Sequence, residues 1–222
     1  MNIYIGIDFS LNSTAMSIID DNTLNVISVF KTDNNINNMF SRNDHFGLLN
    51  SSSEVNLILL EKNKTKSKEY CEVERNKIKL FIELNNFIIS SISKFTKNPD
   101  VYIAMEGISF GSSGNSLIDI SIATGILRNG ILDILDKDFD RFFVFSPTTI
   151  KKFAGKGNFK KIDMLNSLIL NNKENYTLVD LLRSNTDLIV TSSGVVKKPI
   201  EDIVDSIWIA KFLKESIENV QI

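Results

Sequence analysis

Four carboxylates in the sequence lie beside apolar runs rather than in polar loops. Asp8 and Glu106 each follow a short apolar run that is typical of a buried strand. Asp202 and Asp205 directly precede the apolar stretch 207–210. Burying a carboxylate costs free energy unless the group pairs with a cation or binds a metal ion. We therefore predict that these four acids form one catalytic, metal-binding site.

The chemistry of this set follows from its donor atoms and spacing. Residues three apart lie on one face of a helix, so Asp202 and Asp205 repel each other unless a cation lies between them. Carboxylate oxygens suit Mg²⁺ or Mn²⁺. Two such ions about 4 Å apart can activate a water and stabilise the leaving oxygen of a phosphodiester. We predict two Mg²⁺ ions per site, with Mn²⁺ as the alternative, and hydrolysis that leaves a 5'-phosphate without a side-chain base.

Each acid taken alone also has a purely structural interpretation. Asp8 can cap the turn into Ser10, and Glu106 can be an ordinary strand-end residue. Glu201 and Asp202 can favour the start of a helix through its dipole. The joint presence of the acids, in an order of elements that brings strand ends and a helix together, favours a functional site.

The charge pattern contains two basic stretches, although the formal net charge of the chain is -2. An acidic balance argues against a uniformly basic nucleic-acid binder, because phosphate contacts need Lys or Arg. The first stretch is 62–68, and the second carries Lys151, Lys152, Lys156, Lys160 and Lys161. A solvated helix face explains each stretch equally well. For the second stretch we predict phosphate contacts that add salt-dependent affinity without reading base sequence.

The remaining reactive side chains carry no predicted role. Cys71 is the single cysteine, so it has no intramolecular disulfide partner, and His45 lies in a polar segment typical of the surface. No run approaches the roughly 18 apolar residues of a membrane span, and no signal-peptide pattern opens the sequence. We expect a soluble, intracellular protein that is neither secreted nor bound to a membrane.

The apolar pattern predicts the elements that position the acids. Three strands at 3–9, 15–19 and 24–30 follow one another at hairpin spacing and are therefore antiparallel. This order predicts an α/β fold with a mixed, five-stranded sheet and helices on both faces. Further strands are expected at 101–106 and 142–145, and helices at 67–95, 117–135, 148–154, 161–170 and 201–219.

We expect one domain, 1–222, that contains two insertions at about 31–66 and 171–200. Within the first, 31–53 is polar and rich in Asn and Ser, which predicts a loop, while 55–60 fits a strand or a helix equally. The second insertion lacks a clear period and is also predicted to be irregular.

Segments 6–10, 104–107 and 202–206 resemble the three acidic motifs of the RuvC family of Holliday-junction resolvases. In this chain they read Gly-Ile-Asp-Phe-Ser, Ala-Met-Glu-Gly and Asp-Ile-Val-Asp-Ser. The final motif is the most specific, because the family places two aspartates three apart at the start of its last helix. The segment 151–161 also resembles the family's glycine-containing segment with a nearby lysine. About two thirds of the chain follows the family order, and the two longer regions are more like viral, phage or organellar relatives.

The resemblance implies an RNase H-like fold and the four acids as metal-binding, catalytic residues. It implies that Lys161 or Lys160 contacts the scissile strand. It also implies a homodimer that binds branched DNA and makes paired nicks in four-way junctions. Phe110 is the candidate for an aromatic that opens the junction, with a core position as the alternative.

Three other functions stay open from the sequence. Another RNase H-like nuclease, such as an RNase H or a packaging terminase, would share the metal site. A sugar kinase or actin-like ATPase would explain the opening motif with Ser13 and Thr14 as a phosphate cradle, but it needs two lobes and 222 residues are too few. A non-catalytic DNA-binding or assembly module would keep the fold without cleavage.

Overall fold

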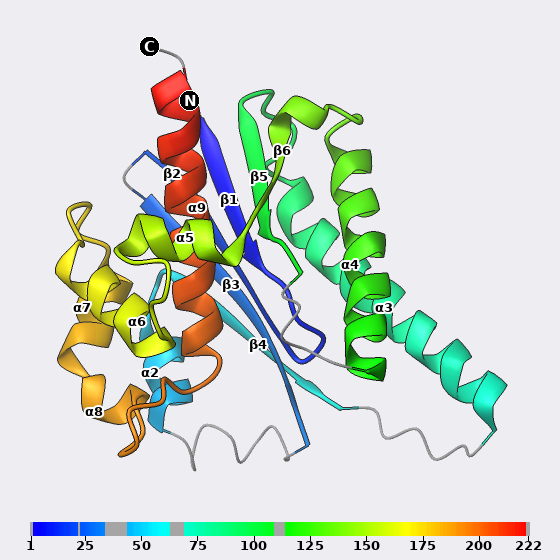
Figure 1. The fold of residues 1–222 in the computed structure, drawn as a ribbon, viewed down its shortest axis with the longest axis horizontal. Coiled ribbons are helices and arrows are strands. Elements are labelled where there is room, and N and C mark those ends of the chain that lie inside the picture. The colour runs from blue at the N-terminus through cyan, green and yellow to red at the C-terminus, as the bar shows by residue number, and fades with distance from the viewer. Residues whose placement is uncertain (1, 22, 34–43, 63–68, 109–113, 221–222) are drawn as a thin grey trace.

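Six strands form one mixed sheet in the part of the chain that the structure describes, which is residues 2–21, 23–33, 44–62, 69–108 and 114–220 of a computed structural model (Figure 1). The strand order across the sheet is β4-β3-β2-β1-β5-β6. The strands are β1 (Ile3–Asp8), β2 (Ser13–Asp20), β3 (Thr23–Thr32), β4 (Val55–Glu61), β5 (Val101–Glu106) and β6 (Phe142–Phe145).

The directions of the strands place two acids at one edge. Strands β1, β2 and β3 are antiparallel neighbours, whereas β5 is parallel to β1 and β6 is parallel to β5. Ile7 of β1 pairs with Met105 of β5, so the next residues, Asp8 and Glu106, end neighbouring parallel strands on the same side. This arrangement confirms the predicted α/β class, with antiparallel strands followed by parallel ones.

The sheet has one strand more than the five predicted. Residues 55–60, which fitted a strand or a helix, belong to β4, which pairs parallel to β3 at the sheet edge. The predicted loop before it is wrong over α2 (Asp44–Ser51), where Phe46 and Leu49 are buried. Residues 34–43 lie outside the described part. A helix of eight residues shows too few turns for its period to stand out from a polar background.

The second predicted irregular region also contains helices, namely α7 (Thr177–Ser184) and α8 (Thr186–Ile189). Helix α7 buries Leu178, Val179 and Leu182, and its first amides are held from another part of the chain. The Glu54 carboxylate accepts hydrogen bonds from the Thr177 N–H at 3.1 Å and the Leu178 N–H at 2.7 Å. A carboxylate at a helix N-terminus satisfies unpaired amides and interacts well with the helix dipole.

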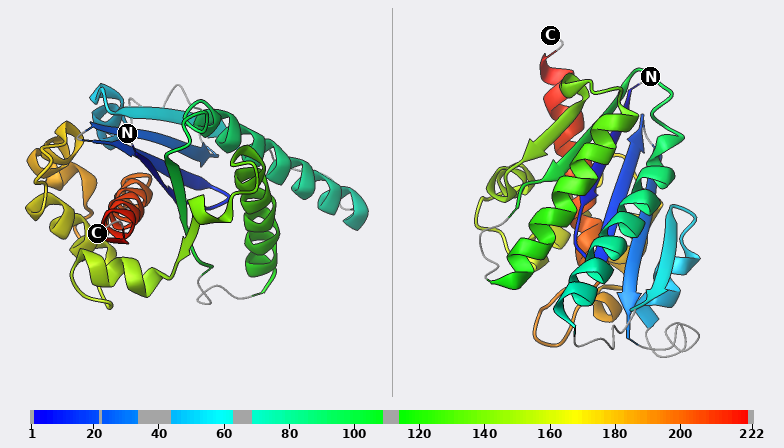
Figure 2. Two further views of the ribbon diagram at one scale, coloured as in Figure 1. Left: turned by 90° about the horizontal axis from the view of Figure 1, so that it is seen from above. Right: turned by 90° about the vertical axis from the view of Figure 1, so that its right-hand side faces the viewer.

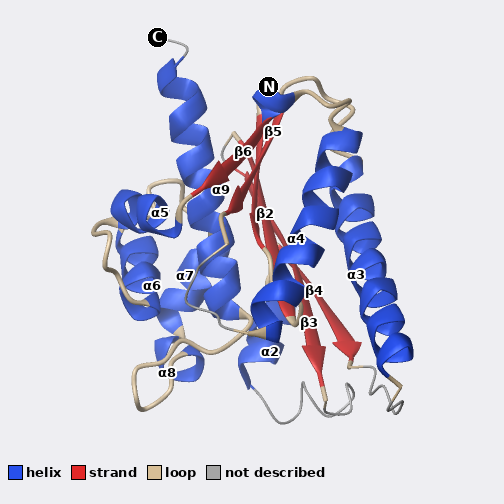
Figure 3. Ribbon diagram, turned by 45° about the vertical axis from the view of Figure 1, so that its right-hand side comes forward, coloured by secondary structure: helices blue, strands red, loops and turns tan. Residues whose placement is uncertain are grey.

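Helices cover both faces of the sheet, as predicted (Figure 2). One face packs against α3 (Tyr70–Ser93) and α4 (Asn115–Ile134). The other packs against α9 (Ile200–Val220), beside which lie α5 (Pro147–Ala154) and α6 (Lys161–Leu170). Figure 3 shows the same layers by secondary structure. A short 3-10 helix, Phe139–Arg141, precedes β6. No described helix is long and apolar enough to cross a membrane.

Alternation along β1 decides which layer the first acid faces. Ile5 and Ile7 belong to the core under α3 and α4, whereas Tyr4 belongs to the core under α9. Successive side chains of a strand point to opposite faces, so Asp8 lies on the same face as Tyr4. By the same count Glu106 shares the face of Ala104, which also packs under α9. Both strand-end acids therefore face α9.

Gly6 allows α9 to approach β1 closely. A Cβ at this position would collide with the backbone of Ser206 and of Ala210. The absence of a side chain lets the helix backbone lie directly on the strand. Asp205 directly precedes Ser206 and Asp202 lies about one turn earlier, so this contact brings both acids beside the end of β1.

Candidate active site

The two strand-end acids, Asp8 and Glu106, lie at the carboxyl edge of β1 and β5 and are partly buried. Among the residues that the structure describes, neither one has an ion pair or a side-chain hydrogen bond. A cavity of about 220 Å³ lies at this edge, lined by Glu106 together with Phe9 and Ser10. Glu106 thus borders a hollow, and neither carboxylate is in direct contact with a cationic side chain among the described residues.

The two helical acids come from the first two turns of α9. Asp202 is 3% exposed and Asp205 is 7% exposed. Their spacing of three residues places them on one face of the helix, as predicted, and that face is turned toward the sheet. The four acids thus meet at one edge although they come from three elements far apart in the sequence.

Asp202 has a partner on each carboxylate oxygen. The Ser13 hydroxyl, at the start of β2, donates to Oδ2. The Lys198 ammonium donates to Oδ1 at 2.9 Å. The carboxylate is therefore both oriented and neutralised within the protein.

Asp205 is paired with Lys161, the first residue of α6. The same ammonium lies 3.2 Å from a carboxylate oxygen of Glu201. Helix α6 is held on α9 by packing and by the Trp208 indole N–H, which donates to the Met164 carbonyl at 3.1 Å. Lys161 is thus fixed against the acidic face of α9 by the contact between two helices.

The acids act on one another through their charges. Burial is the largest cause that raises the pKa of Asp8 well above its ordinary value, followed by the charges of Asp205 and Asp202. Burial and then Asp205 raise the pKa of Glu106. Burial also raises the pKa of Asp205, although Lys161 opposes it. The cluster therefore holds more negative charge than its lysines neutralise.

The donor set fits a divalent cation by its chemistry. Several carboxylate oxygens in a poorly solvated cluster with raised pKa values are what a hard, doubly charged ion stabilises. Among the described residues, no three acidic, histidine or cysteine side chains are already arranged around one ion position. Lys161 and Lys198 hold one oxygen each of Asp205 and Asp202 instead. Direct coordination by all four acids therefore needs local side-chain rearrangement.

The predicted basic stretch meets the acids only in part. Lys161 contacts Asp205, and Lys151 on α5 lies close enough to lower the pKa of Glu106 against the larger effects of burial and Asp205. The three other predicted DNA-contacting lysines are exposed and form no ion pair with the four acids. They are Lys152, Lys156 and Lys160. Phe110, the predicted junction-opening aromatic, lies outside the described residues.

Sequence reasoning missed two residues at the site and misplaced a third. The sequence motif points to Ser13 only as part of a phosphate cradle. Lys198 has no motif of its own, and its spacing of four residues from Asp202 is the one local signal for it. His45, predicted at the surface, is 7% exposed. Its Nε2–H donates to the Lys198 carbonyl at 3.2 Å, so the distant α2 supports the segment that leads into α9.

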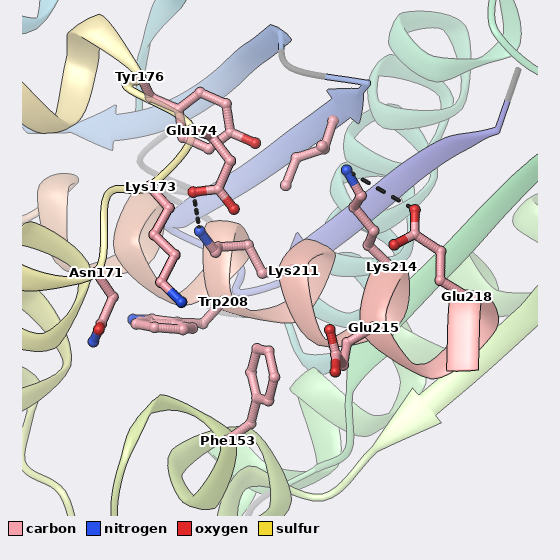
Figure 4. A pocket seen from close by; sticks show the side chains of 11 residues that line it. Phe153, Asn171, Lys173, Glu174, Tyr176, Trp208, Lys211, Lys214, Glu215 and Glu218 are labelled. Atoms are coloured by element: carbon pink, nitrogen blue, oxygen red, sulfur yellow. Dashed lines mark hydrogen bonds and ion pairs between the residues drawn. The ribbon is translucent and has the colours of Figure 1, made fainter. Parts of the chain in front are cut away.

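A second cavity, of about 470 Å³, lies along the later turns of α9 and contains none of the four acids (Figure 4). Lys211 crosses it to pair with Glu174 at 2.7 Å, and it also lies over the rings of Tyr176 and Trp208. These charges are balanced within the cavity, so it lacks the uncompensated charge that marks the acidic edge.

The sequence matches no protein-family model, and no curated protein sequence matches it significantly. Among solved structures, RuvC from Thermus thermophilus is similar, with 12% identity and a TM-score of 0.47 over 94% of this chain and 90% of that one. T. thermophilus RuvC in complex with a Holliday junction substrate has 12% identity and a TM-score of 0.46 over 95% and 91%. The yeast mitochondrial Holliday junction resolvase Ydc2 has 13% identity and a TM-score of 0.47 over 93% and 75%. Likeness at this level is too distant to carry an activity to this chain.

Proposed function

We propose that this chain is a metal-dependent endonuclease whose acids Asp8, Glu106, Asp202 and Asp205 hydrolyse phosphodiester bonds of branched DNA. The observation that supports it is the convergence of these acids at one sheet edge, where three of them have a raised pKa. A protein that only needed a stable core would gain by replacing such a cluster with apolar residues. Perturbed carboxylates beside a hollow are typical of a catalytic site.

The chain's own side chains divide the work. Asp8 and Glu106 would supply ligand oxygens without internal partners, and Asp202 and Asp205 would close the site from α9. Bound Mg²⁺ ions would supply an activated water and stabilise the negative charge that develops on the leaving oxygen. The close approach of α9 at Gly6 would bring the helical acids toward the strand-end acids that complete this ligand set.

The lysines of α5, α6 and the turn between them would hold the strand to be cut. Lys161 and Lys151 already lie beside the acids, and the exposed Lys152, Lys156 and Lys160 would extend this surface along the backbone. Phosphate contacts of this kind release counterions, so affinity should fall steeply with salt concentration. A flat salt response between about 50 and 200 mM would remove this part of the proposal.

Four-way junctions are the substrate that the RuvC-like motifs of the sequence favour, and paired nicks in a junction need two sites, hence a homodimer. RNA:DNA hybrids are the main rival, because the same metal chemistry cleaves either backbone. Selection between these substrates therefore depends on surfaces outside the acid cluster, and a cleavage assay distinguishes them.

The deciding experiment compares cleavage of a labelled synthetic four-way junction with linear duplex, flap and RNA:DNA hybrid in Mg²⁺. Wild type is compared with Asp8→Asn and with Asp133→Asn. The second is a matched change at an exposed position near the C-terminal end of α4. We expect symmetric nicks on the junction alone, lost in Asp8→Asn and kept in Asp133→Asn. Preference for the hybrid would replace the substrate, and inactivity on all four would favour the non-catalytic module.

A further inference from the structure

Asp202 differs from the other three acids because both of its carboxylate oxygens are already held. Ser13 donates to Oδ2, and Lys198 donates to Oδ1 at 2.9 Å. Asp205 has one oxygen in contact with Lys161 and the other without a described partner. If the acids bind a metal ion as proposed above, an ion that approaches Asp202 meets a hydroxyl at one oxygen and an ammonium at the other.

Ser13 is the partner that is fixed. Its residue is 2% exposed, and β2 begins at this position. The turn before it is locked, because the Ser13 N–H donates to the Ser10 hydroxyl at 3.1 Å and that hydroxyl donates back to the Ser13 carbonyl at 2.7 Å. A hydroxyl on a buried strand end with its backbone tied in this way has little freedom to turn elsewhere.

Lys198 is the partner that can move. Its side chain is 47% exposed, and it reaches Asp202 from the segment that precedes α9. His45 holds the Lys198 carbonyl, so the backbone can stay in place while the long side chain swings out. A flexible four-carbon stem lets an ammonium exchange between a carboxylate and water at small cost.

The Lys198 group carries a positive charge that competes directly with a metal ion. Burial is the largest influence on its pKa and lowers it, but Asp202, Glu201 and Asp8 together outweigh burial and raise the pKa. A divalent ion that binds Oδ1 of Asp202 lies beside this ammonium, and two positive charges repel each other at short range.

We propose that Lys198 is an exchangeable counterion of Asp202, displaced from Oδ1 by an entering divalent cation, and that Ser13 is a positioning residue that keeps Oδ2 oriented throughout. This inference rests on the proposed metal site. It assigns opposite effects to two residues that touch the same carboxylate. Removing the ammonium frees an oxygen and takes away a competing charge, so metal affinity rises. Removing the hydroxyl lets the ligand turn, so metal affinity falls.

The test is calorimetric titration of Mn²⁺ into the DNA-free protein. Lys198→Met keeps a long unbranched side chain without the charge, and we expect it to bind Mn²⁺ roughly tenfold more tightly than wild type. Ser13→Ala should bind roughly tenfold more weakly, and Ser13→Thr should restore the wild-type value. Lys214→Met, which removes the same charge from the outer part of α9, should bind like wild type.

The outcomes separate the two proposals. Equal or weaker binding by Lys198→Met, with normal binding by wild type, overturns the exchange and leaves the metal site standing. Absence of Mn²⁺ binding by wild type and by every variant overturns both. Binding by Lys198→Met alone supports the exchange. Wild-type affinity in Ser13→Ala, or weak binding by Ser13→Thr with an intact circular dichroism spectrum, overturns the positioning role of Ser13.

A second measurement does not depend on any variant. The rate at which an amine-reactive acylating reagent modifies Lys198 is followed by mass spectrometry with and without Mn²⁺, with Lys214 as the internal reference. We expect Mn²⁺ to speed modification of Lys198 severalfold and to leave Lys214 unchanged, because displacement frees the ammonium. An unchanged or slower rate at Lys198 when Mn²⁺ is bound overturns the exchange.

Discussion

The helical acids and the strand-end acids of the site are neutralised differently. Asp202 and Asp205 each have a lysine in contact, whereas Asp8 and Glu106 have no ion pair among the described residues. A helix offers positions near each acid in sequence and a groove for a neighbouring helix, so lysines reach the carboxylates. A strand end is flanked by apolar faces, and its side chain meets only what crosses the sheet edge. The uncompensated charge of the site therefore lies at the strand ends.

Gly6→Ala should have the largest effect, because it would move the helical acids away from the strand-end acids. The new methyl group meets backbone atoms of α9, which cannot move aside as a side chain can, so the helix must shift away from β1. We expect a loss of about 3 kcal/mol or more in the free energy of unfolding, measured by urea denaturation. Gly125→Ala on α4, where nothing lies near the added atom, is the matched control and should lose no stability. Equal stability of the two variants would contradict the close approach.

Neutralising one acid of each kind should have opposite effects on the metal-free protein. In EDTA at pH 7.5, Asp202→Asn should lower the free energy of unfolding by about 2 kcal/mol, because it weakens the bonds to Ser13 and Lys198. Asp8→Asn should raise it by about 1 kcal/mol, because it removes a charge that burial and two other acids disfavour.

The pH dependence of that gain follows from the sign of the Asp8 pKa shift. A carboxyl whose folded pKa is raised contributes stability below its unfolded pKa of 3.8, and this is lost as the pH rises through the folded value. The advantage of Asp8→Asn should therefore vanish in acid and be reversed at neutral pH by excess Mg²⁺. Destabilisation by Asp8→Asn in EDTA would show that the strand-end acids are already compensated.

Lys161→Met should leave Asp205 without an ion pair among the described residues, as Asp8 and Glu106 are in wild type. Asp205 and Glu201 lose their shared ammonium, and the pKa of Asp205 should rise further. Because the lysine side chain is partly exposed and screened, we expect a loss of only about 0.5 to 1 kcal/mol in the metal-free free energy of unfolding. Lys152→Met, on the exposed side of α5, is the control and should have no measurable effect. Thermal unfolding in EDTA and in Mg²⁺ measures both, and a loss that Mg²⁺ fails to reduce would contradict the role of Lys161 as a counterion.

The smallest expected effect concerns His45 of α2, which holds the backbone of Lys198, the ammonium partner of Asp202. Burial, then the charge of Lys197, lowers its pKa from 6.5. A lowered histidine pKa contributes stability above the unfolded pKa and loses it as the pH falls through the folded value. Between pH 7.5 and 5, wild type should lose about 0.5 kcal/mol more stability than His45→Gln, measured by denaturant unfolding. An equal loss would mean that protonation of His45 is not opposed by the fold.

Long periodic elements could be predicted from the sequence, and short ones could not. The helix expected at 67–95 is α3, and the strands expected at 101–106 and 142–145 are β5 and β6. Helices α2 and α7 were missed because each has eight residues in a polar segment. Their apolar side chains become informative only when buried against distant parts of the chain. Residues 55–61 likewise form the edge strand β4 because they pair with β3, which is distant in the sequence.

The sequence by itself determined which residues are the acids, because an adjacent apolar run marks a carboxylate that a fold would bury, and local spacing marks Asp202 and Asp205 as one helical face. Only the tertiary structure decided how those charges are balanced. Ser13 and Lys161 reach them across contacts that no local pattern encodes, and the need for glycine at position 6 follows only from the close approach of α9. Periodicity records what a residue's own element buries, whereas the partner of a charge depends on which elements come together in space.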